Sequence, residues 1–135
     1  MSNLERNTYR YYNCNPHHRR TDDCVIRAIA AGDGRPWDEV LTDLYKLMLK
    51  EGYMIGTPEL YGKYLKDNGW VKQKQPTTKD GKKVRIKDFL KTFDGCAIAH
   101  AGNRHVTYLS EGYVYDIWDC SDQIIGSYWV YKGGK

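Results

Sequence analysis

Cys24 is the residue of this chain whose type and setting best suit nucleophilic chemistry. It follows Thr21-Asp22-Asp23, a run that predicts the start of a helix with Thr21 as its N-cap. A thiol in the first turn of a helix meets the positive end of the helix dipole, which favours the nucleophilic thiolate. Asp22 and Asp23 oppose this effect, so the sulfur needs a cationic partner, and histidine is the usual one.

His100 and His105 are the two downstream histidines that could serve as this partner. His105 opens an alternating segment that predicts a strand, and Glu111-Gly112 predicts the turn of a hairpin. A connection of two or four residues places Asp116 diagonally opposite His105 on one face, whereas a three-residue connection places Asp119 there. The register of the hairpin therefore decides which aspartate orients the imidazole.

The rest of the chain predicts helices followed by strands. Apolar residues recur at helical spacing from Pro36 to Gly52, and Thr57-Pro58 and Asn68-Gly69 mark the ends of a further helix. A Lys-rich surface loop or hairpin is expected at 72–83 and a short amphipathic helix at 86–93. Four strands are expected at 96–99, 105–109, 113–118 and 127–131. Helices that precede an antiparallel sheet indicate the α+β class.

Length and composition indicate one globular domain spanning residues 1–135, of which 1–20 form an irregular N-terminal arm. The chain has 41% hydrophobic and 28% charged residues, which excludes a disordered chain or a coiled coil. It shows no apolar run typical of a signal or a membrane span, so we expect a cytoplasmic protein with four reduced cysteines. Nothing in the pattern indicates an oligomeric state.

Three segments together resemble the papain-like cysteine peptidase superfamily, above all its small uncharacterised members in bacteria and their phages. They are the run from Thr21 to Ile29, Arg104-His105-Val106, and the segment from Tyr115 to Asp119. The resemblance extends from about Tyr9 to Tyr131. It implies a papain-like fold, in which the Cys24 helix packs against the sheet, and a cytoplasmic location in a bacterial host cell, with the gene carried by the bacterium or by a phage.

The resemblance also implies a role for each site residue. Cys24 is the nucleophile, His105 is the base that later protonates the leaving group, and Asp116 fixes the imidazole tautomer. In papain-like enzymes a tryptophan often follows the third triad member by two positions and shields it from water. Trp118 follows Asp116 at this spacing. The resemblance therefore favours Asp116 over Asp119 as the third triad member. The implied reaction is hydrolysis or acyl transfer at an amide or isopeptide bond of a peptide or protein, through a thioester and without a cofactor.

One departure concerns the oxyanion hole, to which the backbone N–H of Cys24 is expected to contribute. Papain-like enzymes usually carry a glutamine a few residues before the cysteine as the second donor, whereas the nearest glutamine here is Gln73. His18, Asn15 or Asn13 could donate instead, and His18 stands at about the expected offset. The departure leaves an alternative open, in which a catalytically inactive protein of the same fold binds or inhibits a partner.

Two other interpretations use the N-terminal arm. Cys14, His17, His18 and Cys24 are residue types that bind zinc, but adjacent histidines rarely face one ion and no Cys-x2-Cys pair is present, so no metal is expected. The basic, tyrosine-rich segment from Tyr9 to Arg20 could instead bind a nucleic-acid backbone. A net charge of +4 spread along the chain argues against that, so nucleic acid is not the expected partner.

Overall fold

The structure, a computed structural model, describes residues 7–133 and has the α+β class expected from the sequence. Within this range the chain forms four helices and a six-stranded mixed sheet. The elements are β1 (Tyr9–Tyr11), α1 (Cys24–Asp33), α2 (Trp37–Glu51), α3 (Pro58–Asp67), β2 (Trp70–Gln73), α4 (Ile86–Phe89), β3 (Cys96–Ala101), β4 (His105–Ser110), β5 (Tyr113–Asp116) and β6 (Ile125–Tyr131). No helix in the described range combines the length and the apolar character needed to cross a membrane.

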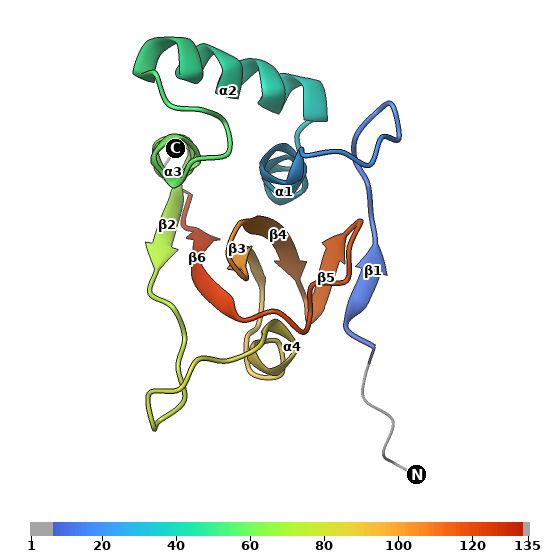
Figure 1. Cartoon of the computed structure of the whole chain (residues 1–135), viewed down its shortest axis with the longest axis vertical. Coiled ribbons are helices and arrows are strands. Elements are labelled where there is room, and N and C mark those ends of the chain that lie inside the picture. Colours follow the sequence, from blue (N-terminus) through green and yellow to red (C-terminus); the bar gives the residue numbers. More distant parts are fainter. Residues whose placement is uncertain (1–6, 134–135) are drawn as a thin grey trace.

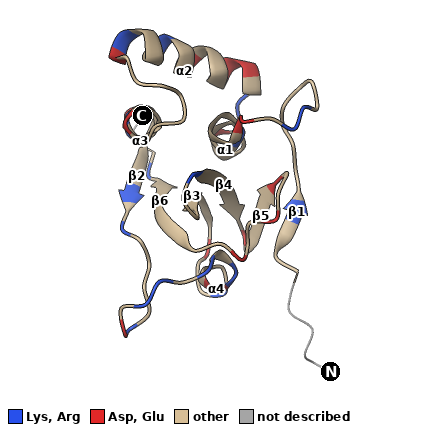
Figure 2. Cartoon of the chain, viewed as in Figure 1, with Lys and Arg blue, Asp and Glu red and all other residues tan. Residues whose placement is uncertain are grey.

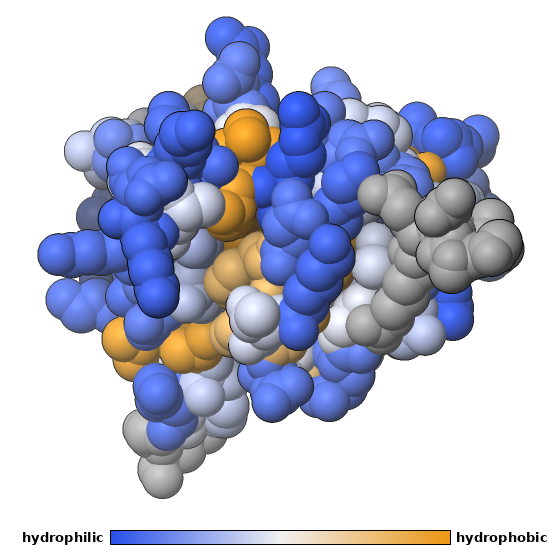
Figure 3. All heavy atoms as spheres, turned by 90° about the horizontal axis from the view of Figure 1, so that it is seen from below, coloured by the Kyte–Doolittle hydropathy of each residue, from blue (hydrophilic) through white to orange (hydrophobic). Residues whose placement is uncertain are grey.

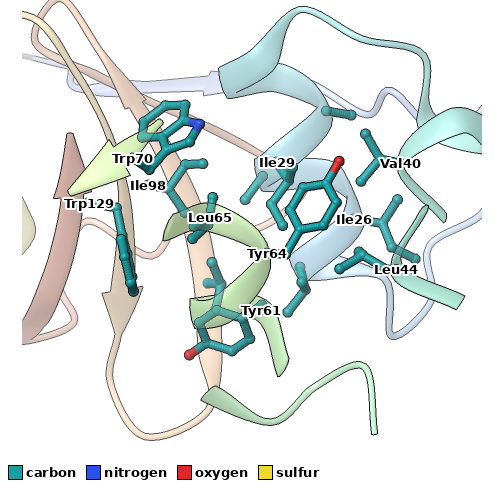
Figure 4. Packing of buried hydrophobic residues seen from close by; sticks show 14 of the residues in the cluster. Ile26, Ile29, Val40, Leu44, Tyr61, Tyr64, Leu65, Trp70, Ile98 and Trp129 are labelled. Atoms are coloured by element: carbon teal, nitrogen blue, oxygen red, sulfur yellow. The ribbon is translucent and has the colours of Figure 1, made fainter. Parts of the chain in front are cut away.

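The helices cover the two faces of the sheet unequally (Figure 1). Helices α1 and α3 lie on one face with α2 outside them, and Ile29, Leu44, Leu65 and Ile98 of β3 belong to one apolar cluster there (Figure 4). The short α4 covers the other face, where a second apolar cluster contains Ile86, Leu109, Val114 and Ile125. Seen from the α4 side, the surface shows a narrow apolar strip between hydrophilic side chains (Figure 3).

The sheet has the strand order β1-β5-β4-β3-β6-β2 and is mixed, which corrects the predicted antiparallel sheet. The difference arises at β1, which pairs in parallel with β5 and places Tyr9 opposite Val114. This segment was assigned to an irregular arm, because three residues are too few for a periodic pattern. β2 overlaps the start of the segment 72–83, for which the sequence predicts a surface loop or hairpin, and its exposed Val71 weakens the alternation that would mark a strand.

Helix α1 begins at Cys24, later than the predicted N-cap at Thr21. Asp23 is the N-cap residue, and its side chain makes no capping bond. Cys24 is therefore the first helical residue, with a backbone N–H that has no acceptor within the helix. The helix packs closely on the sheet at Gly32, where an added Cβ would lie 3.0 Å from both Ile98 Cδ1 and Trp70 Cη2.

The β4–β5 hairpin has the register expected for a two-residue connection. Ser110 pairs with Tyr113, and Glu111 and Gly112 form the turn with φ values of 49° and 88°. Positive φ at both central residues is typical of the type I′ turn, whose twist matches that of the flanking strands. This register places Asp116 next to the start of β4.

Charged residues are distributed unevenly over the elements (Figure 2). They lie on the helices, on β2 and on the loop after it, whereas strands β3 to β6 are almost free of them. Asp116 is the one Asp, Glu, Lys or Arg in those four strands. Because a buried carboxylate costs free energy unless it is paired, its position calls for specific partners.

Candidate active site

His105 and Asp116 belong to a hydrogen-bonded chain at one end of the sheet, and Cys24 lies beside it. His105 Nε2 lies 2.6 Å from Asp116 Oδ2. The Cys24 thiol lies beside the same imidazole, and its interaction with His105 lowers the pKa of the thiol. Since Asp116 engages Nε2, Nδ1 is the ring nitrogen left for the sulfur. Helix α1 supplies the sulfur, the first residue of β4 the imidazole and the last residue of β5 the carboxylate.

The surroundings of the sulfur and the imidazole favour a thiolate–imidazolium pair. Burial raises the pKa of the Cys24 thiol. Interactions with His105 and with the backbone of Val106 lower the pKa by a larger amount, so the net shift is downward. Burial lowers the pKa of His105, but its hydrogen bonds, above all to Asp116, raise it to about 11. The imidazole is therefore protonated at neutral pH, which is the state that stabilises an adjacent thiolate.

Asp116 is 1% exposed, and its carboxylate takes part in five hydrogen bonds, one of them from the Cys120 thiol at 3.9 Å. Oδ2 accepts from His105 and from Thr107 Oγ1, the latter at 2.6 Å. Oδ1 accepts from Arg27 Nη1 at 2.8 Å and from the Ile117 backbone N–H at 2.7 Å. Burial raises the pKa of this carboxyl, but these partners outweigh it and hold the pKa below its usual value. The carboxylate thus fixes the orientation of the imidazole.

Asp23 is neutralised by partners of its own. Its Oδ1 accepts from Arg27 Nε at 2.7 Å, and its Oδ2 accepts from Asn15 Nδ2 at 3.1 Å and Trp37 Nε1 at 3.0 Å. The sequence predicts that the negative charge of Asp23 disfavours a Cys24 thiolate, and these partners offset that charge. Arg27 also lowers the pKa of Cys24. The spacing of four residues between Asp23 and Arg27 was the signal that could have revealed this pair.

The hairpin and the segment after it distinguish the two candidate aspartates. Asp119 Oδ1 accepts from the backbone N–H and the hydroxyl of Ser121, at 3.1 and 2.7 Å. Asp116 is thus the aspartate in contact with His105. The Trp118 ring meets the His105 ring edge-on, with 4.9 Å between centroids.

The side chains expected to complete the oxyanion hole lie elsewhere. Asn15 is buried and its amide donates to Asp23, while the amide of Asn13 donates to the Arg19 carbonyl. His18 is exposed, with a left-handed φ of 55°. None of these three lines the cleft beside Cys24. The prediction fails because local hydrogen bonds already use the two asparagine amides and the chain at His18 turns outward.

The cleft at Cys24 has a volume of about 870 Å³. Its walls are the start of α1, the start of α3, the β3–β4 turn and the segment after β5, and the side chains include those of Tyr61, His100, Arg104, His105 and Trp118. Its size lies within the range of roughly 300–1,000 Å³ that is usual for ligand clefts. The proposed nucleophile therefore opens onto a space large enough for a substrate segment.

The zinc-binding residue types Cys14, His17, His18 and Cys24, for which the sequence predicts no metal site, do not form a group of converging ligand atoms in the described part of the chain. Cys14 donates its thiol to the Arg27 carbonyl at 3.6 Å, and the two histidines, 17 and 18, are exposed. Within residues 7–133, the ligand-type group that does converge is His105, Asp116 and Cys120, with ligand atoms within 4.8 Å of one another. Cys120 is fully buried, and Arg27 already balances Asp116, so this group is better described as part of the hydrogen-bonded chain.

The tyrosine-rich N-terminal segment packs against the strand that carries Asp116. The Tyr9 hydroxyl and the Tyr12 backbone N–H each donate to the Asp116 carbonyl at 3.0 Å. The Arg10 guanidinium lies 4.0 Å from the centroid of the Tyr113 ring. Part of this segment is therefore engaged in supporting β5, although Tyr11 stays exposed.

A scan against models of protein families finds no match for this chain, and searches of curated proteins and of solved structures likewise find nothing similar. The functional interpretation therefore depends on the geometry of the site and on the chemistry of its residues. Membership of the papain-like superfamily stays a prediction.

Proposed function

We propose that this protein is a papain-like cysteine hydrolase or acyl transferase, acting on an amide or isopeptide bond of a peptide or protein. The observation that carries the proposal is the arrangement of Cys24 and His105 beside one cleft, with the imidazole bonded to Asp116 and lowering the pKa of the thiol. A sulfur at a helix start, an imidazole and a buried carboxylate in this order are the arrangement that activates a thiol for acyl transfer.

The first half of the reaction forms a thioester. The Cys24 thiolate attacks the carbonyl carbon, a C–S bond forms, and the carbonyl electron pair moves to oxygen. The backbone N–H of Cys24, free of the helix ladder, is placed to donate to this oxyanion. When the C=O bond re-forms, the C–N bond breaks and the His105 imidazolium gives its proton to the departing amine.

The second half releases the acyl group. Neutral His105 takes a proton from water, or from an acceptor amine in a transferase, and the oxygen or nitrogen attacks the thioester carbon. The C–S bond then breaks and the sulfur leaves as the thiolate, with the imidazolium beside it. Asp116 keeps Nε2 of the ring occupied in both halves, so that Nδ1 faces the sulfur.

A peptide library tests the proposal without knowledge of the natural substrate. The protein is incubated with peptides from a proteolysed cell extract, in buffer with and without hydroxylamine, and new termini are identified by mass spectrometry. We expect cleavage in water and acyl hydroxamates with hydroxylamine, because hydroxylamine competes with water for a thioester. The Cys24→Ala variant should abolish both products, whereas Cys96→Ser, which changes an exposed thiol outside the cleft, should keep them.

The same experiment separates the proposed enzyme from an inactive binding protein. Absence of cleavage and of hydroxamates, together with a Cys24 thiol no more reactive toward iodoacetamide than Cys96, would favour the binding protein. Products that survive Cys24→Ala would contradict the assignment of the nucleophile.

A further inference from the structure

Tyr61 and His100 form a second hydrogen-bonded pair in the cleft that the triad does not use. The Tyr61 hydroxyl and His100 Nε2 are in hydrogen-bond contact, and both residues line the cleft together with Cys24. Tyr61 comes from the first turns of α3 and His100 from β3, so two elements hold the pair in place. In Figure 4 the Tyr61 hydroxyl points away from the apolar cluster that holds its ring.

The pair can direct a hydroxyl hydrogen into the cleft. Burial lowers the pKa of His100, so its ring is neutral at pH 7 and carries one N–H. When Nε2 carries that hydrogen, the imidazole donates to the Tyr61 oxygen, and the phenolic O–H is free to donate to another acceptor. Burial, followed by the charge at Cys24, raises the pKa of Tyr61, so the phenol keeps its proton and lies within electrostatic reach of the sulfur.

The oxyanion hole needs such a donor. The Cys24 backbone N–H supplies one hydrogen bond, while Asn13, Asn15 and His18 lie outside the cleft. A tyrosine hydroxyl is among the side-chain groups that stabilise a developing oxyanion. We propose that the Tyr61 hydroxyl is the second donor to the substrate oxyanion and that His100 is the residue that positions it. This inference rests on the proposed function and adds a catalytic residue to it.

Two reactions of the same sulfur distinguish this role from a structural one. 4-Nitrophenyl acetate acylates a thiolate through a tetrahedral oxyanion, in which the C–S bond forms and the C–O bond then breaks to release 4-nitrophenolate. Iodoacetamide alkylates the thiolate by direct displacement of iodide and forms no oxyanion. A donor to the oxyanion should therefore affect the first rate constant and not the second.

The test measures both second-order rate constants at Cys24, with the modified residue located by mass spectrometry, in the wild type and in Tyr61→Phe. We expect the acylation constant to fall about 10²-fold and the alkylation constant to change less than about twofold. Tyr64→Phe is the matched control, since Tyr64 lies on the same helix but outside the cleft and bonds to Arg35. It should change neither constant.

His100 is tested by rescue. His100→Ala should lower acylation selectively, and His100→Gln should restore most of it, because the glutamine amide can occupy the place of Nε2 and donate to the phenol oxygen. An equal fall of both constants in Tyr61→Phe, or no change in either, would overturn the role of Tyr61. A wild-type Cys24 that is alkylated no faster than Cys96 would overturn the proposed function itself, and the oxyanion role with it.

Discussion

Arg27 donates a hydrogen bond to Asp116 across 2.8 Å, and both side chains are buried. Arg27 lies one turn after Cys24 on α1, and it also pairs with Asp23 at the start of that helix. The contact therefore ties the helix that carries Cys24 to the strand that ends in Asp116, 89 residues away from Arg27 along the chain. One guanidinium balances two buried carboxylates and sets the distance between the elements that form the site.

Replacement of Arg27 by glutamine should destabilise the fold strongly. Removal of one partner from a buried ion pair leaves an uncompensated charge, which costs about 3–5 kcal/mol. The loss is measured by urea unfolding followed by tryptophan fluorescence. Arg35→Gln is the matched control, because Arg35 pairs with Asp43 at the partly exposed surface and should cost at most about 1 kcal/mol. Equal losses in the two variants would contradict the role given to Arg27.

The rate of Cys24 alkylation should depend on pH in a way set by its partners. The pKa of Cys24 is lowered, so alkylation should stay fast below the pH at which an ordinary thiol loses reactivity. His105 keeps its proton up to a pKa of about 11, so the imidazolium partner persists through the neutral range. His105→Ala should shift the midpoint of the profile to higher pH. The measurement is iodoacetamide labelling between acid and alkaline pH, and a midpoint that does not move would contradict the ion pair.

Asp116→Asn should reduce both activity and stability at neutral pH. The variant removes the partner that raises the pKa of His105, so the imidazole loses its proton more readily and the thiolate loses its counter-charge. We expect at least about a tenfold fall in Cys24 alkylation at neutral pH, since one unit of pKa corresponds to a factor of ten. Asp119→Asn, which removes a contact to Ser121 only, is the control and should alkylate like the wild type.

The stability difference between wild type and Asp116→Asn should itself depend on pH. The folded-state pKa of Asp116 is lowered, so the stability it contributes is present above the unfolded carboxyl pKa and is lost as the pH falls through the folded value. The folded-state pKa of His105 is raised, so its contribution is complete below the unfolded value and is lost as the pH rises through about 11. Urea unfolding at several pH values should show that the difference in free energy of unfolding between the wild type and Asp116→Asn becomes smaller as the pH falls. A difference that does not change with pH would contradict the ionised state of Asp116.

Trp118→Ala should weaken the site more than the fold. Trp118 is 44% exposed, so its loss should cost the fold less than the loss of a fully buried tryptophan, but it takes away the edge-on contact with His105. Aromatic contacts of this type contribute about 0.5–1.5 kcal/mol, which predicts a fall in Cys24 alkylation of roughly two- to tenfold. Thermal unfolding monitors the fold in the same samples. A large drop in the unfolding temperature with unchanged alkylation would show that the tryptophan is structural.

Several parts of the site could be predicted from local sequence. Glu111-Gly112 predicted the turn of the hairpin, but the sequence left open whether the connection has two, three or four residues, and the structure shows the two-residue turn that brings Asp116 beside His105. The helix start was predicted too early at Thr21, because three polar residues in succession are all good N-caps and propensity alone does not choose among them. The partners of Asp23 were missed, since Asn15 and Trp37 reach it only after the chain folds.

The sequence by itself determined the three long helices, the later strands, the position of the hairpin turn and the place of a thiol at a helix start, because turn chemistry and hydrophobic period act over a few residues. Only the tertiary structure decided that Arg27 neutralises both Asp23 and Asp116, that β1 joins the sheet in parallel, and that Tyr61 meets His100 in the cleft. These contacts join segments far apart in the chain, and their energy depends on burial and on angles between elements. Neither quantity is encoded in the spacing of residues.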